Sequence, residues 1–153
     1  RRIALAALAL VGLAGAAQAQ EAPELVTVLA SEDAQTQLMG MVLTMQAVQQ
    51  GADAHILLCG PAGDLALRDA PPSATAPQEP QGMSPQGLMQ KIMETGTQVE
   101  VCAIYLPNKG AGPEVLLDGI TPADPAAMAA RLLTPNARSI RHSGHSGRPM
   151  TEK

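Results

Sequence analysis

The sequence is almost without aromatic side chains. Among 153 residues there is one tyrosine, Tyr105, and there is neither phenylalanine nor tryptophan. The core must therefore be aliphatic, and the eight methionines are expected to fill gaps that rings would otherwise fill. The formal net charge of −4 disfavours nucleic acid as a partner, and the basic C-terminal residues have no aromatic side chains between them.

Long apolar runs are also scarce, and the longest, residues 3–14, follows two arginines and precedes Ala17-Gln18-Ala19. This layout is typical of a secretory signal peptide, and the run is shorter than the roughly 20 residues that span a bilayer. We expect a periplasmic or secreted protein with no membrane contact after cleavage. Three parts are predicted: a signal peptide (1–19), one domain (20–142) and a flexible tail (143–153).

Nucleotide-binding glycine motifs are missing as well. No Gly-x-Gly-x-x-Gly or Walker pattern occurs, and the segment 60–63 is too short and lacks the lysine and hydroxyl partners of a phosphate loop. We predict no cofactor.

Short apolar runs alternate with helical patterns along the rest of the chain. The run 54–59 shows no alternation of apolar and polar residues, which predicts a strand buried on both faces, with His55 in a structural role. Apolar residues spaced by three and four predict helices, and Ser84-Pro85 and Asp124-Pro125 are typical helix starts. Residues 70–85 are expected to form a loop. The predicted strands are 25–30, 54–59, 99–106 and 137–142, and the main predicted helices are 31–51, 84–96 and 124–133.

Strands separated by helices indicate right-handed βαβ units. The predicted fold is therefore a three-layer α/β/α sandwich with a mostly parallel sheet of about five strands.

Only two cysteines are present, Cys59 and Cys102, and each lies near the end of a predicted strand. The carboxyl ends of parallel strands meet at one edge, so we expect both thiols at that edge. Three interpretations are open. The cysteines could form a disulfide if their strands are neighbours, about 4.8 Å apart. One thiol could be reactive, its pKa lowered by Lys109 and by backbone N–H groups around Gly110 and Gly112. Both could instead be inert core side chains.

Metal ligands are weakly represented. The segment 39–45 brings three methionines together, but Met41 and Met45 fall on the apolar stripe of the predicted helix, which favours core packing over Cu(I) binding. His142 and His145 have a metal-like spacing, yet no cysteine or acidic residue in the tail completes a site. We predict no metal site.

Several motifs follow one another in a characteristic order: a strand ending in SED, an apolar helix, HILLCG, a variable loop, METGTQVEVCAIYL, and LLDGITPADPAAMAARL. This order resembles the DsrE/DsrF-like family, which includes the TusD-type sulfur-relay subunits. The best marker is the pattern Gly96-x-x-Val99-x-Val101-Cys102, followed by LLDGI. The resemblance covers about residues 24–141.

The resemblance implies a parallel α/β sheet and a homo- or hetero-oligomer, and we expect a homo-oligomer. It also implies that the strands carrying Cys59 and Cys102 are not neighbours, which disfavours a disulfide. In relay members a cysteine at the matching strand end carries sulfur as a persulfide, and that cysteine is Cys102 here. Export would separate the chain from cytoplasmic relay partners, and the segment AIYLPNKGAG lacks their Arg-Gly-rich turn, so a role in tRNA modification is not expected.

Two functions follow from these observations. The first is a periplasmic sulfur carrier, sulfurtransferase or thiol-redox protein, in which a Cys102 thiolate accepts sulfane sulfur and an acceptor thiolate attacks it. Its partner would be a sulfur donor or acceptor protein or a small thiol. The alternative is a non-catalytic domain that binds a small ligand or a partner, with structural cysteines.

Overall fold

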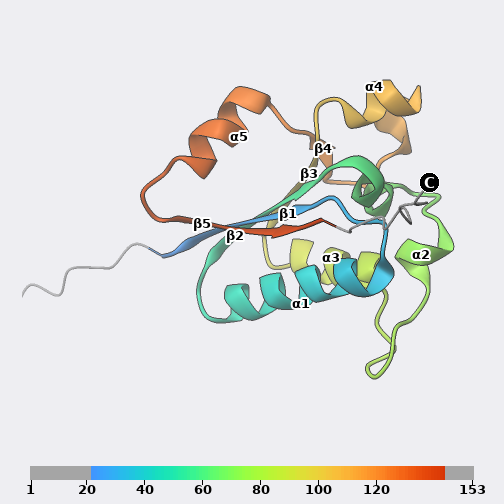
Figure 1. Ribbon diagram of the computed structural model, residues 1–153, viewed down its shortest axis with the longest axis horizontal. Coiled ribbons are helices and arrows are strands. Elements are labelled where there is room, and N and C mark those ends of the chain that lie inside the picture. Colours follow the sequence, from blue (N-terminus) through green and yellow to red (C-terminus); the bar gives the residue numbers. More distant parts are fainter. Residues whose placement is uncertain (1–21, 144–153) are drawn as a thin grey trace, which may run out of the picture.

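Five parallel strands form the central sheet of the protein (Figure 1). A computed structural model describes residues 22–143. The strands lie in the order β4-β3-β2-β1-β5, so that β5 returns to the far side of β1. Their bounds are β1 (Glu24–Leu29), β2 (Asp53–Leu58), β3 (Gln98–Val101), β4 (Thr121–Pro122) and β5 (Ala137–His142).

Helices cover both faces of this sheet. α1 and α3 lie against one face, and α4 and α5 lie on the other side (Figure 1). The predicted three-layer α/β/α sandwich is therefore confirmed. The helices are α1 (Ala34–Gln49), α2 (Pro72–Thr75), α3 (Pro85–Met93), α4 (Tyr105–Lys109) and α5 (Pro125–Leu132), with two 3-10 helices, η1 (Gly60–Ala66) and η2 (Pro113–Val115).

The predicted signal peptide, 1–19, and all but the first residue of the predicted tail, 143–153, lie outside the described residues. Within 22–143, no helix combines the length and apolar character that crossing a membrane requires.

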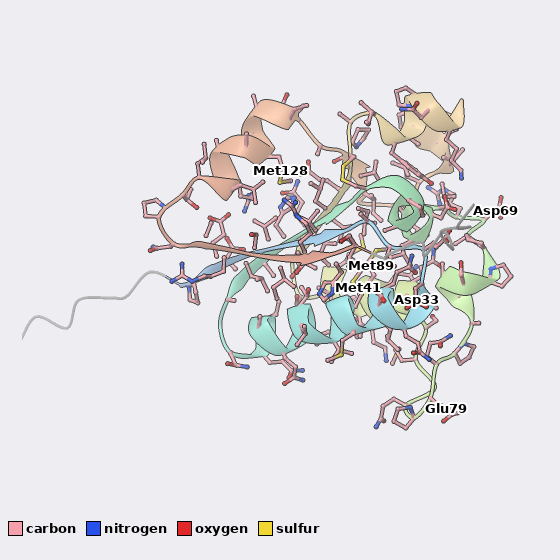
Figure 2. The ribbon with its side chains drawn as sticks, in the orientation of Figure 1. Asp33, Met41, Asp69, Glu79, Met89 and Met128 are labelled. Atoms are coloured by element: carbon pink, nitrogen blue, oxygen red, sulfur yellow. A yellow bond between two sulfur atoms is a disulfide. The ribbon has the colours of Figure 1, made fainter. Side chains whose placement is uncertain are left out.

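The main core lies between the sheet and the layer of α1 and α3. Met41 and Met89 are fully buried there (Figure 2), as the apolar stripe predicted for Met41. A smaller core lies under α5, where Met128 packs with Val26 and Leu57. All residues of β2 after the first are buried, which confirms a strand covered on both faces. Burying each such large apolar side chain contributes about 1.5–3 kcal/mol.

The helix starts largely follow the sequence. Ser84 Oγ accepts a hydrogen bond from Gly87 N at 3.1 Å, and Asp124 Oδ1 accepts one from Ala127 N at 2.7 Å. α1 instead begins after Asp33, whose carboxylate accepts from Thr36 N. Ser31 is buried ahead of the helix, and its hydroxyl accepts a hydrogen bond from Asp33 N at 3.1 Å.

The strand predicted for 99–106 ends early, at Val101. β2 ends at Leu58, which lies opposite Val101. The hydrogen bond from Cys102 N to Leu58 O is the last one between these two strands. The chain then forms α4, whose first residues take the place of the end of the predicted strand, and the helix is capped by Gly110, where φ is 68°.

Candidate functional site

Both cysteines lie at the carboxyl edge of the sheet, as expected. Cys59 follows β2 directly, and its N–H donates to Leu29 O at 2.8 Å. Cys102 follows β3 directly, and its N–H donates to Leu58 O, also at 2.8 Å. These bonds continue the sheet ladders by one residue, so the backbone of each cysteine is held by the neighbouring strand.

Cys59 and Cys102 are joined in a disulfide (Figure 2). Their Cα atoms are 5.1 Å apart, within the usual range for a bridged pair. The expectation that their strands are not neighbours is therefore wrong. β2 and β3 pair directly, with Leu58 opposite Val101, and the residues that follow these two meet across the same edge. Of the three interpretations left open, the structure shows the disulfide.

A pocket of about 410 Å³ opens beside this disulfide. Both cysteines are half-buried, and both form part of the wall of this pocket. The side chain of Ile104 at its rim is 70% exposed. The residues that line the pocket are Cys59, Gly60, Cys102, Ile104, Tyr105, Asn108 and Lys109.

One carboxylate organises the polar side of the pocket. Asp64 Oδ1, from η1, accepts a hydrogen bond from the Tyr105 hydroxyl at 2.6 Å and another from Lys109 Nζ at 2.8 Å. Lys109 Nζ also lies 5.6 Å from the centre of the Tyr105 ring. We call Asp64, Tyr105 and Lys109 the Asp64 latch.

The latch shifts the ionisation of its own members. Burial would raise the pKa of the Asp64 carboxyl, but the hydrogen bonds from Lys109 and Tyr105 outweigh it and hold this pKa below its ordinary value. Burial, together with the Asp64 hydrogen bond and charge, raises the pKa of the Tyr105 phenol above its ordinary value. At neutral pH the latch therefore holds an ionised Asp64 against a protonated Tyr105.

The groups that the sequence suggested for activating a thiol are engaged elsewhere. Lys109 lines the pocket as expected, but its ammonium group pairs with Asp64. Gly110 N donates to Pro107 O, and Gly112 N donates to a carboxylate oxygen of Glu114.

Sequence reasoning missed Asp64 and Tyr105. These two residues are separated by 41 positions and meet only through the tertiary fold. The available signal was that the one aromatic side chain of the sequence stands three residues after Cys102.

His55 belongs to a separate polar cluster on the α5 side of the sheet. Its Nε2 lies 2.8 Å from Glu100 Oε2, its Nδ1 is buried without a partner, and the side chain is 2% exposed. Burial, and then the charge of Arg131, lower the pKa of His55 despite the opposing effect of Glu100. Arg131 itself pairs with Glu24. None of these residues lines the disulfide pocket, so they support the fold and not the cysteine site.

No group of three or more histidine, cysteine and acidic side chains within 22–143 is arranged to hold a metal ion. Of the two tail histidines, His142 is the last residue of β5 and His145 lies outside the described residues.

Comparison with known proteins supports the fold. No protein-family model matches the chain, and no curated protein matches it in sequence. Two solved structures are similar. MTH1491 from Methanobacterium thermoautotrophicum, a protein of unknown function, has a TM-score of 0.57 at 14% identity, covering 78% of this chain and 98% of its own. The ychN protein from E. coli has a TM-score of 0.60 at 16% identity, covering 78% and 99%. Both have the DsrE/DsrF-like fold, so the resemblance read from the sequence holds at the level of fold.

Proposed function

We propose that this chain is an exported thiol–disulfide redox protein in which Cys59 and Cys102 cycle between disulfide and dithiol. The observation that carries the proposal is the place of the bond: it joins two neighbouring strand ends at the wall of an open pocket. Reactive cysteines are partly exposed in this way, whereas buried structural cysteines are inert, and exposed disulfides are the ones that are more readily reduced. The export signal predicted at 1–19 would bring the protein to a compartment where disulfides persist.

The exchange needs only the two sulfur atoms and a thiol substrate. A substrate thiolate in the pocket attacks Cys102 Sγ, the disulfide breaks, and Cys59 leaves as a thiolate. A second substrate thiolate then attacks the substrate sulfur of the mixed disulfide and expels the Cys102 thiolate. The two substrate thiols are oxidised to a disulfide, and their protons pass to Cys59 and Cys102. Cys102 is assigned as the attacked residue because most of the other lining residues follow it in the chain: Ile104 and, from α4, Tyr105, Asn108 and Lys109.

The presence of Cys59 beside Cys102 also changes the expected fate of a sulfane sulfur atom bound to Cys102. In the reduced protein, Cys102 thiolate would take a sulfur atom from a persulfide donor and release the donor as a thiolate. Cys59 thiolate, on the adjacent strand end, would then attack Cys102 Sγ, close the disulfide and release hydrosulfide. The persulfide sulfur is reduced while the two cysteines are oxidised. A neighbouring second cysteine therefore favours a redox function over a stable sulfur carrier.

The first test is the native redox behaviour of the full mature chain. Its non-reduced mass should be lower than the fully reduced mass by two hydrogen atoms. Dithiothreitol should reduce the bond without denaturant, after which iodoacetamide should label both cysteines. A bond that is reduced only after denaturation would sink the proposal and favour the binding domain with structural cysteines.

A second test separates redox chemistry from sulfur carriage. Reduced wild-type protein, treated with glutathione persulfide, should release sulfide and return to the disulfide. The C59S variant should instead keep one extra sulfur atom on Cys102, and C102S, the matched control, should release no sulfide. Wild-type protein that retains the extra sulfur and passes it to a thiol acceptor would overturn the redox assignment in favour of a carrier.

A further inference from the structure

The two segments that follow the cysteines are fastened to one another by the Asp64 latch. Asp64 lies in η1, which begins directly after Cys59, and Ala62 N in the same turn donates to Cys59 O at 3.2 Å. Tyr105 starts α4, and its N–H donates to Cys102 O at 2.8 Å. The turn that carries Asp64 is thus hydrogen-bonded to Cys59, and Tyr105 is hydrogen-bonded to Cys102, so the latch spans the same gap as the disulfide.

The contact is close as well as polar. Tyr105 is 8% exposed, and its ring lies directly on the backbone of Gly63. A Cβ added at Gly63 would come closer to the ring than any ordinary contact allows. The ring and η1 therefore leave no free space between them, and the two segments cannot shift apart without breaking the Tyr105–Asp64 hydrogen bond.

A second junction joins the same segments further along the chain. Arg68 N donates to Val115 O at 2.9 Å, Leu117 N donates to Ala66 O at 2.8 Å, and the Arg68 guanidinium pairs with Asp118 at 2.7 Å. This ion pair is exposed, with Asp118 94% accessible, and neither of its members lines the disulfide pocket. It offers an internal control: it joins the same two segments but does not touch the cysteine site.

We propose that Asp64 and Tyr105 are positioning residues that hold the Cys59 and Cys102 thiols together in the reduced protein and so lower the reduction potential of the pair. This inference rests on the proposed redox function. The position of a disulfide equilibrium depends on the effective concentration of one thiol at the other. A contact that keeps both strand-end segments in place raises that concentration and favours the disulfide.

The coupling is reciprocal. If the latch strengthens the disulfide by a given factor, then reduction weakens the latch by the same factor. Tyr105 reports on this directly, because it is the only tyrosine and the chain has no tryptophan. Opening the latch should return the ionisation of the Tyr105 phenol towards the ordinary value of a tyrosine, 10.0. Its near-ultraviolet absorbance during a pH titration should therefore separate the closed latch from the open one.

The test uses the full mature chain and three variants, Y105F, D64N and the control D118N. Each is equilibrated in glutathione buffers of graded potential, quenched by alkylation and read by mass. Y105F keeps the ring and loses only the hydroxyl, and D64N keeps the shape of the side chain and loses its charge. Both should shift the equilibrium about threefold to tenfold towards the dithiol, where tenfold corresponds to about 30 mV for a two-electron couple. D118N should stay within about twofold of wild type, as expected for an exposed pair.

Two results would overturn the inference. The first concerns the variants: the reduction potentials of Y105F and D64N could equal that of wild type, or the potential of D118N could shift as far as theirs. The other needs no variant: wild-type Tyr105 that ionises at the same pH in the oxidised and reduced proteins would show that latch and disulfide are not coupled. Failure of the proposed function gives a different result, namely slow exchange with substrate thiols, while the equilibrium potential can still be read after long incubation with dithiothreitol.

Discussion

Reduction of the Cys59–Cys102 bond should leave a less stable but folded protein. The bond closes a loop with a sequence separation of 43, for which the chain-entropy model gives a stabilisation of about 4 kcal/mol. Domains of this kind unfold with about 5–15 kcal/mol in total. The β2–β3 ladder and the Asp64 latch do not depend covalently on the bond. Their contacts, with the buried core, should keep the dithiol form folded.

Urea denaturation followed by far-ultraviolet circular dichroism checks this expectation. Dithiothreitol should lower the free energy of unfolding by about 4 kcal/mol, which is about 2 M in the urea midpoint for a typical slope of about 2 kcal/mol/M. The C59A/C102A double variant should show the same loss without reductant and no further loss with it. If the reduced protein has no cooperative transition, the bond is a structural staple and redox cycling is refuted. If reduction leaves the midpoint unchanged, the loop argument itself is wrong.

Three further predictions concern the surroundings of the site and the core. G63A should force the Tyr105 ring away from η1 and destabilise the protein by about 1–3 kcal/mol in urea denaturation, whereas a ring that fits without loss would contradict the close contact. The pKa of His55 is lowered in the folded state, so its neutral form contributes stability that is fully present above about pH 6.5 and is lost as the pH falls through the folded pKa. The urea midpoint of the wild-type protein should therefore drop between about pH 7 and 5. The H55Q variant should show a smaller drop over the same pH range. M41A should cost about 2–5 kcal/mol because Met41 is fully buried, while M39A, at a side chain 51% exposed on the same helix, should change stability by less than about 0.5 kcal/mol.

The layers of this fold could be predicted because their signals are local. The run 54–59 reads as a buried strand from its own residues, and Ser84 and Asp124 mark helix starts within one turn. β4 gave no such signal. It consists of two residues, Thr121 and Pro122, at the edge of the sheet, where a proline without an N–H is tolerated.

The candidate site could be predicted only in part, because the disulfide depends on the order of the strands in the sheet, in which β2 and β3 are neighbours. Strand ends alone place Cys59 and Cys102 at one edge, which the sequence was sufficient to show. Whether a further strand separates them depends on pairing between residues far apart in the chain, and a pattern within each strand does not encode it. The same holds for the contact of Asp64 with Tyr105, which exists because β2 and β3 are neighbours.

The place of the disulfide also bears on the choice between a structural and a redox function. The backbone N–H of Cys102 already bonds to Leu58 O, so the ladder holds the two strand ends in register without help from the sulfur atoms. The disulfide is therefore not needed to define the native arrangement, although it lowers the conformational entropy of the unfolded chain. In the folded molecule it is a half-buried disulfide in the wall of a pocket, with the Asp64 latch beside it. The proposed redox function requires that the bond open and close repeatedly without the site being rebuilt, and a sheet ladder that sets the geometry independently of the sulfur atoms meets that requirement.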